Sequence, residues 1–365
     1  MVLIMYKYYL EDVEWRDFFI GGEEGIFGIK STKSGIDKNK LNVEEGTIPY
    51  ITRSDGDNGI NLFVTDEQNE KYKMDQGNVI TIGLDTQTVF YQANPFFTGQ
   101  NIQVLRRDDL NENISMFIIP LIKIQMEKFN WGGNGATLSR LNGTKIMLPI
   151  DKFNNPNWFF MGEYIKERKN KQREELKDYY KNRLLDLVIS PEILTDVDWG
   201  EFFLGDVFSI DTKPSKGLNH LIKADRKGIP YVGATNRNNG VLDFVEKDSK
   251  LQYEGNCIAF IRNGEGSMGY SIYKRESFIA TQDISVGYNE NLNEYSAKFI
   301  TTIADRVRGK YTFGYKRNQA RLKKEILTLP IDKDRNPNWT YMESFIKNIE
   351  QKQIKNILKY LDEYI

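Results

Sequence analysis

The sequence predicts an α+β protein built as a tandem repeat, with two homologous globular regions of mixed α/β structure that are each followed by a long helix. Three observations support this fold class. The phrase LPIDKFNNPNW, which ends at Trp158, recurs as LPIDKDRNPNW, which ends at Trp339. Further matches precede each phrase in the same order. A long polar stretch with regularly spaced apolar residues follows each phrase.

The repeat covers nearly the whole chain. DVEWRDFFIG begins at Asp12 and matches DVDWGEFFLG from Asp196, and GTIPYITRSDGDNGI matches KGIPYVGATNRNNGV. Runs rich in β-forming residues, such as NVITIG and NCIAFI, alternate with turn-rich segments in both copies. The repeat predicts four segments, which are a first globule over residues 1–151, a central long helix over 152–190, a second globule over 191–332 and a C-terminal long helix over 333–365.

The two polar stretches have the pattern of amphipathic helices, because apolar residues recur at steps of three and four. Asn155 and Asn336 are the predicted N-caps, and Pro156 and Pro337 suit the first helical position, where no N–H is needed. At 1.5 Å per residue the helices would be roughly 50 Å and 43 Å long. Helices of this length need a partner, and a pseudo-twofold relation between the copies would pair them antiparallel.

The composition describes a soluble globular protein, with 40% hydrophobic and 28% charged residues among 365. The longest apolar run, Met116 to Ile124, is too short for a membrane span and contains Pro120. The first residues lack the basic start and the cleavage site of a secretory signal. A single cysteine excludes an intramolecular disulfide and is typical of a reducing compartment. We expect a cytoplasmic protein without a membrane partner.

Charge is distributed unevenly, although the net charge is −1. Residues 1–151 contain 15 basic and 21 acidic side chains, whereas residues 298–324 contain nine basic and one acidic. Tyr311, Phe313 and Tyr315 are interleaved with this basic segment. Because basic side chains pair with phosphates, the segment indicates a local nucleic-acid contact, and the alternative is a solvated helix end. The counterpart in the first copy has little charge and keeps Phe129, Trp131 and Arg140.

Glycine-rich and NPNW motifs give only weak indications of catalysis. Gly264, Gly266 and Gly269 form a literal G-x-G-x-x-G, but YSIYKRESF after it predicts a strand where a dinucleotide site needs a helix. We interpret it as a hairpin or a DNA-facing loop. NPNW resembles the base-holding motif of adenine methyltransferases, yet no glycine-rich cofactor strand precedes it. Both of its copies lie at predicted helix starts, where Asn-Pro has a capping role.

Other candidates for metal or nucleophilic chemistry also favour structural interpretations. The E-x-K triplets that begin at Glu167 and Glu350 lie within the long helices, where a solvated face is the simplest interpretation. His220 is the only histidine and has no triad companion. Cys257 aligns with Val79, which predicts a buried small apolar residue. We expect no catalytic residue, no metal site and no cofactor in this chain.

The order of globule, long helix, globule and long helix resembles the DNA-specificity subunits of restriction–modification systems. The resemblance extends from residue 12 to about residue 365. It is carried by the duplicated order of elements, the IPY segments with Asn-Gly turns, ATQDISV, ARLKKEILTLPI and the opening W..F.LG..F.I. Type I members commonly have a Glu-Gln pair after the proline-containing stretch, whereas this chain has NPNWxxM. A type I system and a compact type IIB-like system both remain open.

The resemblance implies a non-catalytic subunit in which each globule is a target-recognition domain for one half of a split double-stranded DNA sequence. It implies that the helices hold the domains apart and dock DNA adenine methyltransferase subunits, which bind S-adenosylmethionine. A restriction or translocase subunit is a further partner in some such systems. The alternatives are a stand-alone DNA methyltransferase or nuclease, and a protein-interaction scaffold without a DNA role.

Candidate DNA contacts are side chains that match base edges or phosphates and that lie in the variable loops or in the basic segment. Asn and Gln can bind adenine, and Arg can bind guanine. In the first copy these candidates are Thr52, Arg53, Asn58, Gln100 and Arg140. In the second copy they are Asn236, Arg237, Asn238, Arg262, Gln282, Lys310, Lys316, Arg317 and Arg321.

Overall fold

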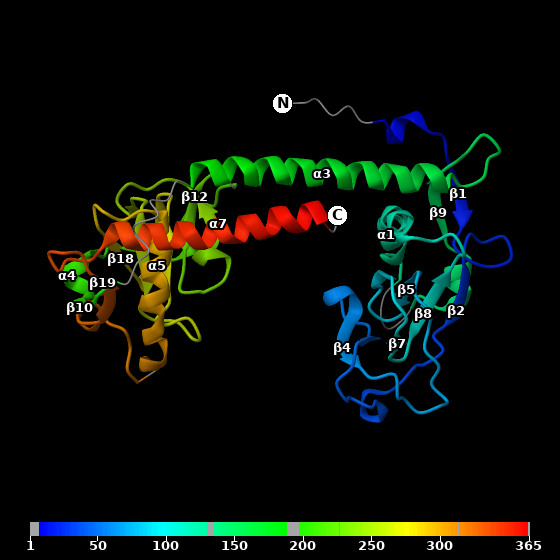
Figure 1. Ribbon diagram of the computed structural model, residues 1–365, viewed down its shortest axis with the longest axis horizontal. Helices are drawn as coiled ribbons and strands as arrows, with labels where there is room; N and C mark the ends of the chain where they lie inside the picture. The colour runs from blue at the N-terminus through cyan, green and yellow to red at the C-terminus, as the bar shows by residue number, and fades with distance from the viewer. Residues whose placement is uncertain (1–6, 130–134, 188–196, 226, 313, 364–365) are drawn as a thin grey trace. The chain divides into compact units, whose positions relative to one another are not determined.

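A computed structural model describes residues 7–129, 135–187, 197–225, 227–312 and 314–363. The chain divides into two compact units, Met1–Leu176 and Lys177–Ile365, and the boundary between them falls inside the long helix α3 (Trp158–Asp186). Figure 1 labels the main elements of each unit.

The described part of the first unit contains two larger sheets and one strand pair. The four-stranded antiparallel sheet has the order β2 (Gly28–Ser31), β8 (Ile102–Arg106), β5 (Val79–Gly83) and β6 (Val89–Gln92). The three-stranded sheet has the order β4 (Ile60–Val64), β3 (Ile48–Ile51) and β7 (Phe97–Thr98), with β3 parallel to β7. The pair β1 (Trp15–Phe19) and β9 (Lys145–Pro149) joins the two ends of the globule. Its α-helices are α1 (Glu112–Met126) and α2 (Leu138–Asn142), and its short 3-10 turns are Leu10–Asp12, Lys38–Lys40 and Asp57–Gly59.

The second unit repeats this topology. Its first four-stranded sheet has the order β11 (Ser209–Asp211), β18 (Ile284–Tyr288), β15 (Cys257–Ile261) and β16 (Ser271–Lys274). Its second has the order β13 (Val241–Val245), β12 (Ile229–Val232), β17 (Phe278–Ala280) and β14 (Gln252–Tyr253). The closing pair is β10 (Trp199–Phe203) and β19 (Ile326–Pro330). Its helices and 3-10 turns are α4 (Leu204–Val207), α5 (Glu294–Ala304), α6 (Gln319–Lys323), α7 (Trp339–Glu363), Leu218–His220, Asn238–Gly240 and Asp305–Lys310.

The Asn-Gly turns predicted in both copies have the same backbone conformation. Asn58 and Asn239 have φ angles of 55° and 51°, and the glycines after them have φ angles of 78° and 76°. This left-handed region is easily reached by Asn and Gly and is costly for most other residues. Each turn follows a β-bulge at the same position of the strand pair, so the repeat extends to local backbone geometry.

Both globules are built around a strand that is buried on its two faces. β5 and β15, the predicted runs VITIG and CIAFI, contain only buried residues in the structure. Such continuous apolar strands require cover on both sides. In the first unit the core also includes Ile118 and Ile122 of α1 and Met161 of α3. In the second unit the core beside α5 includes Met342 of α7. Each long helix is therefore anchored by its first turns in a globule.

The structure corrects the predicted helix caps. The α3 helix begins at Trp158, and the Oδ1 atom of Asn157, not of Asn155, accepts the backbone N–H of Phe160 at 3.0 Å. In the second copy Asn338, not Asn336, caps α7 by accepting the N–H of Tyr341 at 2.9 Å. The first Asn of each NPNW belongs to a loop that is closed by an aspartate. Asp151 Oδ1 and Asp332 Oδ1 accept the N–H groups of Asn155 and Asn336 at 3.0 Å and 2.8 Å. The prediction placed each cap two residues too early because Pro in the first turn is a general preference and not a rule.

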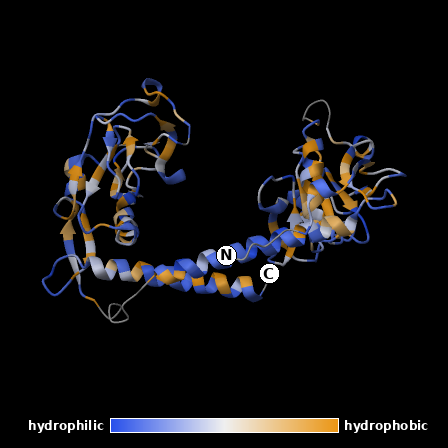
Figure 2. Ribbon diagram, turned by 90° about the horizontal axis from the view of Figure 1, so that it is seen from above, coloured by the Kyte–Doolittle hydropathy of each residue, from blue (hydrophilic) through white to orange (hydrophobic). Residues whose placement is uncertain are grey.

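The C-terminal part of α3 pairs antiparallel with α7 inside the second unit. Lys177 and Asp362 form an ion pair at 2.6 Å, and Arg183 and Glu350 form another at 2.6 Å. Partners thus run in opposite directions along the two helices. The predicted fold class, a tandem α+β repeat with long antiparallel helices, is confirmed. Figure 2 shows both long helices as mixtures of polar and apolar residues.

Candidate nucleic-acid interface

In each unit three loops lie together at one end of a four-stranded sheet. This sheet is β2-β8-β5-β6 in the first unit and β11-β18-β15-β16 in the second. Backbone hydrogen bonds join the loops in the same way twice. Gly99 N–H donates to Ile51 O at 2.8 Å and Thr281 N–H to Val232 O at 2.9 Å. We call the two sets the first loop cluster, residues 52–59, 84–88 and 99–101, and the second loop cluster, residues 233–240, 262–270 and 281–283.

The first loop cluster brings two predicted residues together with two that the sequence analysis missed. Arg53 pairs through Nη1 with Asp85 Oδ2, and Asn101 Nδ2 donates to the same oxygen at 3.1 Å. Gln100, next to Asn101, donates from Nε2 to Asp37 Oδ1 at 2.7 Å. Asp85 and Asn101 could have been found because they directly follow the buried strand β5 and precede β8. Their side chains restrain Arg53, which stays 43% exposed.

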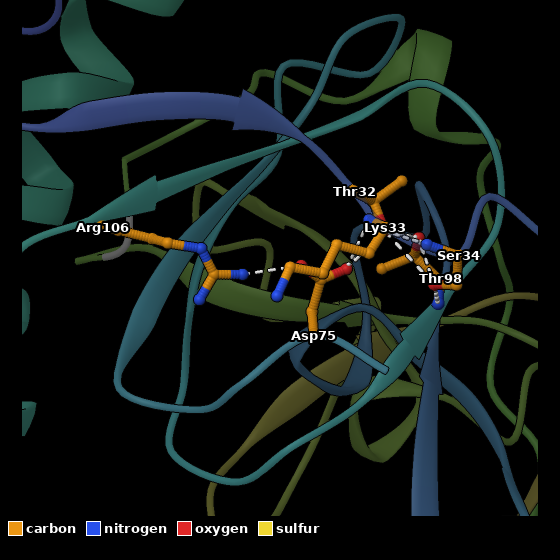
Figure 3. Close-up of polar contacts among 6 residues, drawn as sticks. All are labelled: Thr32, Lys33, Ser34, Asp75, Thr98 and Arg106. Atoms are coloured by element: carbon orange, nitrogen blue, oxygen red, sulfur yellow. Dashed lines mark hydrogen bonds and ion pairs between the residues drawn. The ribbon is translucent and has the colours of Figure 1, made fainter. Parts of the chain in front are cut away.

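A buried carboxylate holds the loop that leads to this cluster. Asp75 is 1% exposed and lies between Arg106 on one side and Thr32 and Lys33 on the other (Figure 3). Its Oδ1 atom accepts from Arg106 Nη2 at 2.6 Å, and its Oδ2 atom accepts from Thr32 Oγ1 at 2.6 Å and from Lys33 N–H at 2.9 Å. In the second unit Tyr253 takes this position, and its hydroxyl accepts the N–H of Lys213 at 2.5 Å. The same loop is thus fixed by different chemistry in the two copies.

Two other predicted contacts of the first copy have structural roles. Thr52 N–H donates to Gly59 O at 2.8 Å and closes the left-handed turn. Asn58 Nδ2 donates to Tyr91 O at 2.8 Å, and Gln92 Nε2 donates back to Asn58 O at 3.1 Å. These bonds join the turn to β6. The side chain of Asn58 is exposed, but its amide already donates to Tyr91 O. Asn58 is therefore less available to a base edge than Arg53.

The second loop cluster has a related but different set of side chains. Asn263 Nδ2 donates to Asp283 Oδ1 at 3.1 Å, and Arg262 Nη2 donates to the backbone oxygen of Gln282. The predicted residues Arg262 and Gln282 therefore lie together, whereas Asn263 and Asp283 were missed. Asn236, Arg237 and Asn238 are all exposed in the loop after β12.

The glycine-rich loop and the basic segment meet in an open pocket of about 1060 Å³ in the second unit. Its lining includes residues 263–266, Tyr270, Lys316 and, from the basic segment, Asp305, Arg306, Arg308, Gly309, Tyr311 and Thr312. A Cβ at Gly269 would lie 2.9 Å from Arg308 Cα, so glycine permits the close approach of the two segments. The guanidinium carbon of Arg308 lies 4.2 Å from the ring centre of Tyr270.

The strand β16 follows the glycine-rich loop, as the sequence predicted in place of a nucleotide-binding helix. Arg306 and Arg308 belong to the pocket but were not selected from the sequence, although they lie within the basic segment that was. Lys310 and Lys316 are exposed. Phe313 lies outside the described residues.

Arg317 was predicted as a DNA contact, and this prediction is wrong because its side chain is 0% exposed. Its Nε and Nη2 atoms donate to the two oxygens of Glu325 at 2.7 Å and 2.6 Å, and Nη1 donates to Tyr270 O at 3.3 Å. Tyr311 donates its hydroxyl to the same carboxylate. Burial, together with the hydrogen bond to Glu325, raises the pKa of Tyr311 well above its usual range. Sequence alone could not distinguish this buried arginine from exposed ones in a basic segment.

Arg140 and Arg321 each make an equivalent hydrogen bond to a backbone oxygen. Arg140 Nη1 donates to Gly135 O at 2.8 Å, and Arg321 Nη1 donates to Lys316 O at 2.7 Å, five residues back in each case. Both arginines thus close the loop before a short helix. Arg140 also lines an open pocket of about 650 Å³ with Lys128, Phe129 and Lys145. Arg321 lies 3.8 Å over the ring of Tyr315. Trp131 lies outside the described residues.

The remaining motifs have structural partners. Glu167 accepts the N–H groups of Lys7 and Tyr8 at 2.6 Å and 3.2 Å, and Glu350 is paired with Arg183, so both glutamates are partly exposed and also have protein partners. The predicted burial of Cys257 is confirmed. His220 is exposed at the end of a short 3-10 turn.

Among the described residues, no group of three or more His, Cys, Asp or Glu side chains could hold a metal ion. Over the same part of the chain, no helix has the length and apolar character that crossing a membrane requires.

The fold and the loop clusters define a class of protein with two homologous domains, each presenting polar loops at one end of a sheet. The model of a family described as the type I restriction modification DNA specificity domain matches residues 13–178 and again residues 196–360. The chain is 31% identical over 324 residues to the specificity subunit S.BcgI of a type II restriction enzyme from Heyndrickxia coagulans, covering 87% of this chain and 91% of that one. The chain belongs to this family and is a DNA specificity subunit of a restriction–modification system.

The fold is similar to a solved structure as well. The S subunit of a type I restriction–modification system from M. genitalium superposes with a TM-score of 0.61 at 16% sequence identity. The match covers 96% of this chain and 94% of that chain, so the tandem architecture as a whole corresponds.

Proposed function

We propose that this subunit is a non-catalytic reader of a bipartite double-stranded DNA target. Each loop cluster reads one half-site, mainly through the major groove, where base edges are distinguishable. The long helices separate the readers and dock DNA adenine methyltransferase subunits, which bind S-adenosylmethionine. In this division of labour residues 1–151 and 191–332 are target-recognition domains, and residues 152–190 and 333–365 form the spacer.

The repeated loop cluster with divergent side chains is the observation that carries this proposal. The backbone bonds that gather the loops recur at nearly equal lengths in the two units. The side chains on them differ, with Arg53 and Asp85 in the first unit against Ala234 and Asn263 in the second. Readers of two different sequences need a common scaffold and different contact residues, and this arrangement has both.

Charge and aromatic side chains support DNA as the ligand of the second unit. Arg306, Arg308 and Lys316 line one pocket with Tyr270, and Lys310 lies beside it. Cationic side chains neutralise phosphates, and loop arginines can also reach bases. The first unit carries the excess of acidic residues, yet Lys128, Arg140 and Lys145 line an open pocket in it.

The class of system is also part of the proposal. The 31% identity to a type II specificity subunit, against 16% to a type I subunit, favours a compact system in which one partner chain carries methylation and cleavage. Co-purification tests this assignment. A single partner species is expected, and separate methyltransferase and translocase chains would contradict it.

The central experiment is a selection of randomised duplex DNA by the complex of this chain with its methyltransferase. We expect two short defined sequences separated by an unspecified stretch of constant length. A complex that prefers no bipartite sequence over scrambled DNA would contradict the proposal. Crosslinking of labelled S-adenosylmethionine should mark the partner, and labelling of this chain in isolation would instead indicate a methyltransferase.

Charge removal separates DNA binding from a role as a protein scaffold. The double variant Lys310→Gln and Lys316→Gln should weaken DNA binding and reduce the salt dependence by roughly one unit of slope per lost phosphate contact. Lys166→Gln on α3 is the matched control, because Lys166 is exposed and only loosely paired with Glu163 at 3.6 Å. Equal binding by all three proteins would favour a scaffold.

A further inference from the structure

We propose that Arg53 reads a guanine in the half-site of the first loop cluster and that Asp85 and Asn101 are its positioning residues. The second unit has no arginine at the matching place, so the equivalent base of the other half-site is read differently. This inference rests on the proposed function and specifies a base, a residue and a half-site for it.

Arg53 is held on one side only. Its Nη1 atom pairs with Asp85 Oδ2, and no second acceptor contacts its guanidinium within the described ranges. Asp85 is 27% exposed and also accepts from Asn101 Nδ2 at 3.1 Å, so the carboxylate is itself restrained by the neighbouring loop. The arginine is 43% exposed. A partly exposed cation with a fixed support on one side is therefore presented to solvent.

This arrangement suits guanine. The major-groove edge of guanine offers two acceptors, O6 and N7, and an arginine can donate two parallel hydrogen bonds to them. The planar guanidinium carries five N–H donors, so a bond to Asp85 leaves donors for a base. Restraint by the carboxylate before binding lowers the conformational entropy that is lost on contact.

Comparison of the two copies shows that the carboxylate at position 85 accompanies the arginine. The strand registers align Asp85 with Asn263 and Asn101 with Asp283. The loop-to-loop hydrogen bond is 3.1 Å long in both units, but its donor and acceptor are exchanged. A hydrogen bond whose only role was to join the two loops could have its donor on either loop, and the two units show both arrangements.

The orientation found in the first unit is the one that puts the carboxylate within reach of residue 53. In the second unit Ala234 occupies the place of Arg53. The second cluster has two other arginines, the exposed Arg237 in the loop after β12 and Arg262, which aligns with Leu84 and is tied to the backbone oxygen of Gln282. Neither lies at the place of Arg53, so the two clusters present arginine from different positions.

An ion pair with this exposure contributes little to stability by itself. Removal of Arg53 should leave the fold intact, so the effect of the substitution can be read in DNA selectivity. The second half-site provides an internal control, because the second unit does not contain the altered residue.

The test compares the methyltransferase complex of the original chain with complexes that carry Arg53→Ala, Arg53→Lys, Asp85→Asn or the control Arg16→Ala on β1, whose side chain is exposed. Each complex selects from duplexes randomised at the defined positions, at one fixed salt concentration. We expect the original chain to prefer guanine at one position, and Arg53→Ala to reduce that preference roughly 5- to 150-fold. Arg53→Lys and Asp85→Asn should reduce it less, and Arg16→Ala should leave it unchanged.

The outcomes separate this inference from the proposed function. If the original complex selects no bipartite sequence, the proposed function itself fails. If it does, but Arg53→Ala weakens binding equally for all bases, Arg53 contacts phosphate and the inference is overturned. An unchanged preference in Arg53→Ala also overturns it. In the last two outcomes the unchanged selection at the second half-site reports that the variant is folded.

Discussion

The second unit contains a buried ion pair that supports its fold and is not accessible at its surface. Arg317 and Glu325 are 0% and 1% exposed and share two hydrogen bonds, with Tyr311 as a third member. The residues at the matching positions of the first unit are Ala136 and Thr144, which are uncharged. The network fastens the loop before α6 to the core, and so it supports the pocket that contains Lys316.

Arg317→Ala should lower the free energy of unfolding of the second unit by about 3–5 kcal/mol, because it leaves Glu325 buried without its cation. Urea unfolding followed by far-UV circular dichroism measures the change. Arg321→Ala, which removes an arginine that is not fully buried, is the matched control and should cost less than about 1 kcal/mol. The double variant Arg317→Met and Glu325→Met should recover much of the loss. A loss in Arg317→Ala no larger than that of the control would contradict this role.

Cys257 provides a pH-dependent prediction. Burial raises the pKa of its thiol from 9.0 to about 12. The folded state thus binds the proton more tightly than the unfolded state. This contribution to stability is complete below about pH 9 and is lost as the pH rises through 12. At pH 8 the native chain should react with a thiol reagent far more slowly than the chain in urea, and equal rates would show that the thiol is accessible.

At the scale of elements, the repeated NPNW combines a loop and a helix cap. Asn157 caps α3 and Asn338 caps α7, whereas Asn155 and Asn336 use their backbone N–H groups to close an aspartate loop. Each copy of the motif therefore has two structural roles in succession. Its loop follows the last strand of a globule, and its second Asn starts the long helix.

Asn157→Ala should destabilise the first unit by about 1 kcal/mol, since it removes an acceptor for an orphan helical N–H. Asn155→Ala is a close control, because the side chain of Asn155 is exposed and its backbone makes the loop bonds. Thermal unfolding of both variants distinguishes the two caps. A larger effect for Asn155→Ala would restore the cap that the sequence suggested.

The pairing of α3 with α7 depends in part on Arg183 and Glu350, which are 27% and 24% exposed. The carboxylate of Glu350 raises the pKa of Arg183 above its usual range. Arg183→Glu should destabilise the second unit by about 1 kcal/mol through like charges, and the exchange Arg183→Glu with Glu350→Arg should restore stability. A double-mutant cycle measured by chemical denaturation gives the coupling. Zero coupling would mean that apolar residues such as Ile354 alone hold the pair.

At the scale of the whole molecule, each globule is closed by its own first and last strands. Ile150 N–H donates to Glu14 O at 2.8 Å, and Ile331 N–H donates to Asp198 O at 2.9 Å. The pairing of the closing strands, with a long helix after them, thus recurs in both copies, while the loops between them differ in their side chains. Recognition can change in one copy without altering the helices.

A chimera in which residues 198–331 replace residues 14–150 should fold and form its complex. Because both readers would then carry the second loop cluster, we expect it to select a target with two half-sites of one sequence. Selection from randomised duplexes measures this outcome. Retention of the original, unequal half-sites would show that residues outside the exchanged segments specify the bases.

Much of the architecture was predictable because the repeat supplied an internal comparison. The continuous apolar runs at β5 and β15 and the Asn-Gly turns lie where the sequence indicated. The candidate site was predictable only in part. Arg53 and Gln100 were predicted as separate loop residues, but their partners Asp85 and Asp37 contact them from loops that are distant in sequence. A pattern in one dimension does not contain these contacts.

The duplicated topology, the long helices and the division into a shared scaffold and variable loops follow from residue order, because periodicity and repetition are properties of the sequence. The tertiary structure decided which polar side chains face solvent. It buried Arg317 against Glu325, left Arg53 exposed against Asp85, and moved the caps to Asn157 and Asn338. The physical reason is that burial and hydrogen-bond partners depend on how distant segments pack, and side chains of the same type acquire different roles once those segments meet.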